Sequence, residues 1–102
     1  MAKVDATEHN GETHLRYRCP GCKNDHSVPA KRWHWNGSVD APTFSPSVRH
    51  FYIRPKDGAD VTICHYNVID GKIAFCGDCQ HDLKGQTVEL PDIDQLEVDA
   101  CN

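Results

Sequence analysis

Long apolar runs are missing from this chain of 102 residues. No segment approaches the ~18 consecutive apolar residues that a membrane-spanning helix needs, and the start, MAKVDATEHNGETH, contains no apolar stretch of the signal-peptide kind. These absences exclude a helical membrane span and favour a cytoplasmic protein. In that reducing compartment, paired cysteines are more often metal ligands or redox centres than disulfides.

Basic charge is also scarce. The chain has 11 Lys and Arg residues against 15 Asp and Glu residues, which gives a net charge of −4. Residues 76–102 alone hold one basic and seven acidic side chains. This balance argues against non-specific binding to DNA or RNA. A protein is therefore the favoured partner, and a nucleic acid is the less favoured one.

The length allows one domain, in which 38% of the residues are apolar. A domain this small buries a limited share of its surface, so a bound metal adds useful stability. We expect a flexible N-terminal arm over residues 1–12, one zinc-stabilised β domain over residues 13–92, and an acidic C-terminal tail over residues 93–102.

The pattern of polar and apolar residues is nearly all β. Strands are predicted over residues 14–18, 26–28, 32–35, 48–54, 61–69, 72–75 and 86–90. Tight hairpin turns are predicted at Asn36-Gly37 and Asp70-Gly71, whereas the prolines of residues 41–47, APTFSPS, argue for an extended surface connection. The predicted fold is mainly β: a small, zinc-ribbon-like antiparallel domain with at most one short helical turn, at residues 81–85.

Six cysteines provide the clearest chemical signal. Two Cys-x-x-Cys pairs supply Cys19, Cys22, Cys76 and Cys79, and two such turns can complete the tetrahedral shell of a structural zinc ion. The Asp70-Gly71 turn predicts a register in which His65 faces Cys76, and this register brings Cys64 close to residues 76–79. Cys64 and His81 are therefore alternative ligands, and Cys101 is the poorest candidate.

Two further groups of residues suggest other functions. His65, Asp78 and His81 could converge on an open metal position or act as general acid and base, as in a metal-dependent hydrolase or nuclease. Arg32, Trp33 and Trp35 combine basic and aromatic side chains, so they are a candidate binding surface, and in a zinc ribbon such residues can stack on single-stranded nucleic acid.

Several motifs together resemble an uncharacterised family of short bacteriophage and prophage proteins, often mislabelled "ammonia monooxygenase". The matching segments, within residues 19–92, are CPGC with a following His, WNG, PTFSPS, CH and DGKIAFCGDCQH with LKGQTVELPD. The resemblance implies a zinc-binding phage protein in the bacterial host cytoplasm. It also implies that Cys64, His65 and His81 recur, whereas only one of Cys76 and Cys79 needs to be cysteine.

The sequence as a whole favours a non-enzymatic binding module. A small β domain built around a metal leaves little room for a cleft, so contact with a host or phage protein through its surface is the favoured function. The hydrolase or nuclease and the nucleic-acid-binding zinc ribbon remain as alternatives.

Overall fold

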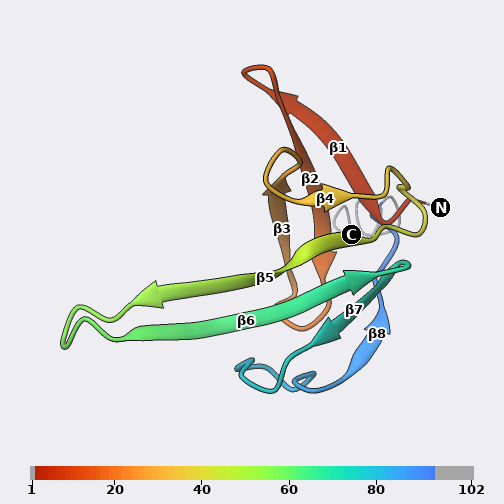
Figure 1. Cartoon of the computed structure of the whole chain (residues 1–102). Helices are drawn as coiled ribbons and strands as arrows, with labels where there is room; N and C mark the ends of the chain where they lie inside the picture. Colours follow the sequence, from red (N-terminus) through yellow and green to blue (C-terminus); the bar gives the residue numbers. More distant parts are fainter. Residues whose placement is uncertain (1, 94–102) are drawn as a thin grey trace, which may run out of the picture.

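The computed structural model of this chain describes residues 2–93. Its strands form two antiparallel sheets, with the order β1-β2-β3 in one and β4-β5-β6-β7-β8 in the other (Figure 1). The strands are β1 (Val4–His9), β2 (Glu12–Cys19), β3 (Asn24–Pro29), β4 (His34–Trp35), β5 (Phe44–Ile53), β6 (Asp60–Ile69), β7 (Lys72–Phe75) and β8 (Thr87–Glu89). The predicted mainly β, antiparallel fold is confirmed. Within the described residues, no helix has the length and apolar character needed to cross a bilayer.

The N-terminal segment is a strand, which corrects the flexible arm expected over residues 1–12. β1 pairs with β2 from Val4↔Tyr17 to His9↔Glu12. The turn between them has positive φ at Asn10 and Gly11, as a tight hairpin requires. Most of the segment is polar because β1 lies at the edge of its sheet, and this polarity concealed the strand from the sequence pattern. The expected acidic tail falls almost entirely on residues 94–102, outside the described residues.

The hairpin of β6 and β7 has the predicted register. Ile69 faces Lys72 and Tyr66 faces Phe75, while Asp70 and Gly71 both have positive φ. The second predicted hairpin is wrong, because Asn36 and Gly37 begin a longer loop that returns at Phe44, the partner of Trp35. The Asn36 side chain holds this loop by donating to the Ala41 carbonyl and accepting from the Ser38 amide.

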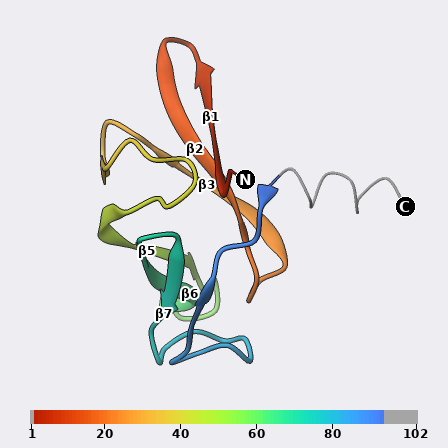
Figure 2. The same cartoon turned by 90° about the vertical axis from the view of Figure 1, so that its right-hand side faces the viewer.

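The core lies between the two sheets, which appear as separate layers in Figure 2. Tyr17 of β2 and Tyr66 of β6 are both buried, and their hydroxyl oxygens lie 2.5 Å apart. Phe44 packs against the Tyr17 ring at a centroid distance of 5.4 Å. Burial raises the pKa of both tyrosines well above their ordinary range, so the contact is a neutral hydrogen bond that links the layers.

The β5 strand departs most from the sequence-based expectation. Residues 41–47 were expected to be an extended surface connection, yet β5 includes Phe44 to Ser47. The ladder between β5 and β6 is interrupted between Phe44 and Val48. Pro46 lies in this interruption. Proline has no N–H to donate to the ladder, and a β-bulge is a place within a sheet where that donor is not needed.

Replacing Gly71 with alanine tests the β6–β7 turn. Gly71 has a φ of +77°, and a Cβ atom there would lie 3.3 Å from the Ala41 Cα atom. A left-handed conformation costs an L-residue about 1–2 kcal/mol, so we expect Gly71→Ala to lower the free energy of unfolding by about that amount in urea titrations. Gly77→Ala is the control, because no atom lies within 4 Å of its added Cβ. An equal loss in both variants would contradict this account.

Candidate active site and metal centre

Strand β6 separates two clusters of reactive side chains. Successive residues of a strand point to opposite faces of the sheet, and in β6 Cys64 and Tyr66 are buried whereas His65 between them is partly exposed. Cys64 therefore faces the other sheet, and His65 faces the open side of its own sheet. The two clusters lie back to back across one strand.

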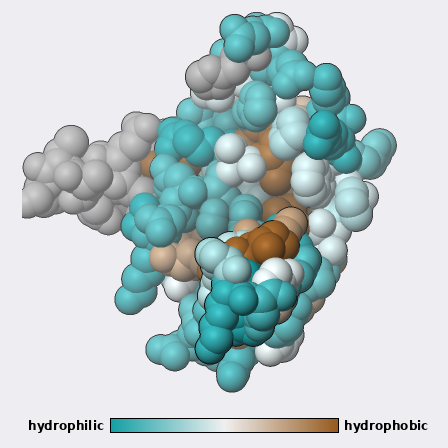
Figure 3. Space-filling model, turned by 90° about the vertical axis from the view of Figure 1, so that its left-hand side faces the viewer, coloured by the Kyte–Doolittle hydropathy of each residue, from teal (hydrophilic) through white to brown (hydrophobic). Residues whose placement is uncertain are grey.

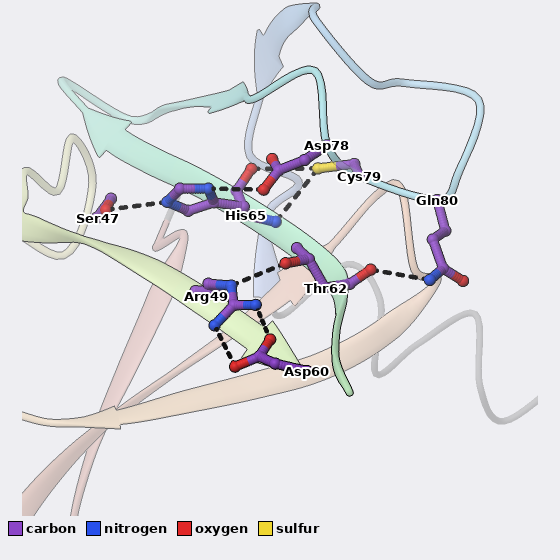
Figure 4. A network of polar contacts seen from close by, with 8 residues as sticks. All are labelled: Ser47, Arg49, Asp60, Thr62, His65, Asp78, Cys79 and Gln80. Carbon is purple, nitrogen blue, oxygen red and sulfur yellow. Dashed lines mark hydrogen bonds and ion pairs between the residues drawn. The ribbon is translucent and has the colours of Figure 1, made fainter. Parts of the chain in front are cut away.

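On the open face, a serine, a histidine and an aspartate form a line of contacts (Figure 4). The Ser47 Oγ atom lies 3.2 Å from His65 Nε2, and His65 Nδ1 lies 3.3 Å from Asp78 Oδ2. Each ring nitrogen of His65 thus has its own partner. The side chains of His65 and Asp78 are 27% and 50% exposed, so a substrate can reach them from solvent.

The bulge in β5 accounts for the position of Ser47. Bulges redirect side chains and are common beside active sites. Ser47 lies between Pro46 and Val48, where the β5–β6 ladder resumes with Val48 facing Tyr66. Val48 is buried and Ser47 is half-buried, so alternation along the strand directs the serine to the face that also carries His65.

The loop after β7 places Asp78, and Cys79 anchors this loop. The Cys79 Sγ atom accepts a hydrogen bond from the His65 amide at 3.2 Å and donates to the His65 carbonyl at 3.1 Å. The Cys76 amide also donates to that carbonyl, at 2.8 Å. Three contacts therefore tie the His65 backbone to the loop that bears Asp78.

On the buried side of β6, four donor atoms converge from the two sheets. Cys19, Cys22, His26 and Cys64 each offer a ligand atom within 4.8 Å of the others. The Sγ atoms of Cys19 and Cys64 lie 4.0 Å apart, close to the ~3.8 Å that two thiolates bound at about 2.3 Å to a tetrahedral zinc would have. His26 Nε2 is buried with no hydrogen-bond partner. Such an orphaned nitrogen fits a metal ligand.

The three thiols of this group differ in pKa, and this difference affects how they would bind a metal ion. A hydrogen bond from Cys64 holds the pKa of Cys19 well below its ordinary value. Bonding to Cys19 and burial raise the pKa of Cys64, and burial raises that of Cys22 to about 11. The cluster therefore favours a thiolate at Cys19 and protonated thiols at Cys22 and Cys64. A divalent cation that binds these sulfurs would replace the remaining protons.

A second donor group shares Cys64 with the first. It contains Cys64, Cys79 and His81, and His81 Nε2 lies 3.3 Å from Cys64 Sγ. Gly21 makes this approach possible, because a Cβ atom at Gly21 would lie 2.2 Å from the His81 ring. Cys64 is thus the one ligand common to both groups.

The four predicted zinc ligands do not form a single group. Cys19 and Cys22 belong to the first group and Cys79 to the second, whereas Cys76 lies with His65 and Asp78 in a third. Cys64, an alternative ligand in the sequence analysis, joins the first two groups. Cys19, Cys22, Cys64, Cys76 and Cys79 are all free thiols, and Cys101 falls outside the described residues.

The other predicted residues have simpler surroundings. His81 lies with the cysteines rather than with His65 and Asp78, so the three residues of the predicted hydrolase site are divided. Trp33 and Trp35 are half-buried against the core, and Arg32 is exposed. The Trp33 indole N–H donates to the Pro46 carbonyl and that of Trp35 to the Ser38 carbonyl, so both indole donors are used within the chain.

Sequence reasoning missed Ser47. It identified the PTFSPS segment as ordered, and it identified His65 and Asp78 as candidate catalytic residues. No local pattern joins a serine in a proline-flanked segment to a histidine 18 residues later. A search that included the residue directly before each strand pairing with the strand of His65 would have found it, because Ser47 precedes the strand predicted over residues 48–54.

A serine, a histidine and an aspartate that are joined in this order by hydrogen bonds form the arrangement found in serine hydrolases. The family model for "Bacterial ubiquitination-like system serine protease (BubE)" matches residues 2–76, so the chain belongs to the BubE family. The matched range includes Ser47 and His65, and Asp78 lies just beyond it. No curated protein and no solved structure matches the chain significantly. The match supports a bacterial family, and the expected phage origin has no support from it.

Metal content after single substitutions tests the ligand groups. We expect Cys64→Ser to lose most of the bound metal, because Cys64 belongs to both metal-ligand groups on the buried side of β6. Cys76→Ser should keep its metal, since Cys76 is in neither. Elemental analysis and native mass spectrometry of the purified variants measure this. The reverse pattern would place the metal elsewhere.

Proposed function

We propose that this protein is a serine peptidase in which Ser47 is the nucleophile, His65 the general base and Asp78 the residue that orients His65. The observation that supports this most strongly is the pair of contacts at 3.2 and 3.3 Å that joins the three side chains through the two nitrogens of one imidazole. Membership of a family described as a serine protease agrees with it. This proposal replaces the non-enzymatic module favoured by the sequence.

The geometry assigns a role to each atom. With Asp78 accepting a hydrogen bond from the His65 Nδ1–H group, the imidazole keeps its proton on Nδ1, so that Nε2 is unprotonated and directed at Ser47. Nε2 takes the hydroxyl proton as Oγ bonds to the scissile carbonyl carbon. The same proton then passes to the leaving amine as the C–N bond breaks. A water molecule, deprotonated in turn by Nε2, releases the acyl group and restores Ser47.

We further propose that the metal is zinc and that its role is structural. Thiolates with an imidazole are the donors that closed zinc sites use. Cys64, which both donor groups share, directly precedes His65, so a zinc ion bound to Cys64 also holds the backbone of an active-site residue. The bound ion supplies cross-linking, and the hydrolytic chemistry belongs to the three side chains on the open face.

The substrate that this proposal favours is a protein. A serine nucleophile with a histidine base is suited to acyl transfer from amides, and the description of the family refers to a bacterial ubiquitination-like system. We infer that the protein acts in the bacterial cytoplasm on a polypeptide of such a system. Nucleic acid remains the less favoured partner, consistent with the net charge of −4.

A metal-dependent hydrolase is the second candidate. The observation behind it is the third donor group, in which His65, Cys76 and Asp78 lie within 4.8 Å of one another. It makes His65 and Asp78 metal ligands instead of an acid–base pair. Burial and the nearby Asp78 charge raise the pKa of Cys76, which disfavours the thiolate that this alternative needs.

Substituting the nucleophile tests the proposal directly. Ser47→Ala should abolish labelling by a fluorophosphonate probe and lower kcat for p-nitrophenyl acetate by at least about 1,000-fold, because the attacking oxygen is gone. The control is Ser45→Ala, since Ser45 is exposed on the same strand and has no part in the contacts of His65. If Ser47→Ala retains full activity while Cys76→Ser loses it, the metal-dependent alternative is correct.

Removing the metal tests its structural role. Chelation should lower Tm by at least about 10 °C, since each kcal/mol corresponds to about 4–8 °C in a domain of this size. Fluorophosphonate labelling should fall in parallel as the Cys64 segment of β6 loosens. Adding Zn²⁺ back should restore both, and Mg²⁺, which prefers oxygen ligands, should restore neither. An unchanged Tm after complete removal of the metal would contradict the proposal.

A further inference from the structure

Beyond the active site, the larger sheet narrows to a two-stranded arm. β4 pairs with β5 only at Phe44 and Ser45, and β7 pairs with β6 only over residues 66–69. β5 and β6 continue together as far as the pair Ile53↔Asp60. Figure 1 shows these two strands running out past the rest of the molecule.

The outer edge of this arm is open along β5 and covered along β6. The loop after β7 covers β6, because the Gln80 amide donates to the Ile63 carbonyl at 3.0 Å and Gln80 Nε2 donates to the Thr62 carbonyl at 2.8 Å. On the β5 side, Trp33 Nε1 donates to the Pro46 carbonyl. Within the described part of the chain, no backbone bond outside the ladders involves residues 47–53. The open edge therefore begins at Ser47.

The side chains beside this edge are unusually apolar for exposed positions. Phe51, Tyr52 and Ile53 are 51%, 46% and 54% exposed. Alternation places Phe51 and Ile53 on the same face of the sheet as Ser47. Arg49 lies between Ser47 and Phe51, and its guanidinium is 4.8 Å from the Phe51 ring centre. Figure 3, which views the molecule from the side toward which the arm points, shows a hydrophobic patch within a hydrophilic surface.

An open strand edge with exposed apolar residues normally promotes aggregation, and proteins usually shorten, charge or cover such edges. This edge is neither short nor covered, the Arg49 charge within it is paired with Asp60 of the neighbouring strand, and the edge leads directly to the proposed nucleophile. Its backbone groups are arranged to pair with another extended chain, as in recognition by strand addition. Because this edge is continuous with Ser47, the chain that fits it is the substrate of the proposed peptidase.

We propose that the outer edge of β5, from Ser47 to Ile53, binds an extended segment of the polypeptide substrate as an added strand. This inference rests on the proposed peptidase function. At about 3.3 Å per residue, the seven residues of this edge span about 23 Å and accommodate a substrate segment of similar length. Backbone pairing sets the register of the scissile bond at Ser47, and alternate apolar side chains of the substrate pack on Phe51 and Ile53.

Two variants and a peptide library test this in the full-length, metal-loaded protein. Peptides from a digested bacterial proteome are incubated with the protein, and mass spectrometry identifies those that are cleaved. The test variant is Phe51→Ser/Ile53→Ser. The matched control is Ile69→Ser, because Ile69 is equally exposed, at 57%, but lies at the opposite end of β6.

For the best-cleaved peptides, the double variant should lower kcat/KM at least about 10-fold, mainly through KM. Hydrolysis of p-nitrophenyl acetate should stay within about 2-fold of wild type, since this ester is too small to reach the arm. Ile69→Ser should change neither rate. Methylating alternate backbone nitrogens of the best peptide should also raise KM, because an added strand needs those N–H donors.

Each other result counts against a specific statement. If the ester is hydrolysed but no peptide is cleaved, or if the double variant cleaves peptides normally, the docking proposal is overturned. A wild-type dimer that becomes a monomer in the double variant, measured by light scattering, would assign the edge to a second copy of this chain. If neither the ester nor the fluorophosphonate reacts, the peptidase function itself fails.

Discussion

The arrangement of this protein depends on strand β6, where Cys64 and His65 are consecutive residues with opposite faces. Because side chains alternate along a strand, fixing Cys64 on the buried side also fixes where His65 points. The Cys79 thiol adds a second restraint, through its hydrogen bonds to the amide and carbonyl of His65. The same bonds hold the loop that carries Asp78. The candidate metal ligands on one face and the serine–histidine–aspartate contacts on the other are therefore parts of one local geometry.

A metal bound at this position would compensate for the small core. The two sheets meet through few large side chains, chiefly Tyr17, Tyr66 and Phe44, and a domain of this length buries a limited share of its surface. Donor atoms from β2, the following turn, β3 and β6 converge between the two sheets. Rigid support of this kind matters for catalysis, because a displacement of about 1 Å in a catalytic group is costly.

The proposed function assigns separate tasks to the two sides and the end of one sheet. The buried face of β6 carries metal ligands, the open face carries Ser47 and His65, and β5 continues beyond them as an unpaired edge. A small protein can bind a polypeptide firmly when backbone pairing along an edge provides the affinity. The limited room for a cleft, which favoured a non-enzymatic module at the level of sequence, is thus compatible with a peptidase.

The sequence by itself determined the features that depend on neighbouring residues: the antiparallel β class and the Asp70-Gly71 hairpin with Tyr66 facing Phe75. Turn chemistry and the two-residue period of a strand specify these locally. The sequence also indicated the cysteines and His81 as candidate metal donors. Only the tertiary structure decided which donors meet, leaving Cys76 apart from Cys19 and Cys64, and that Ser47 faces His65. Those contacts depend on a bulge and on pairing between distant strands, and no local pattern records either, because their free energy comes from the packing of the whole chain.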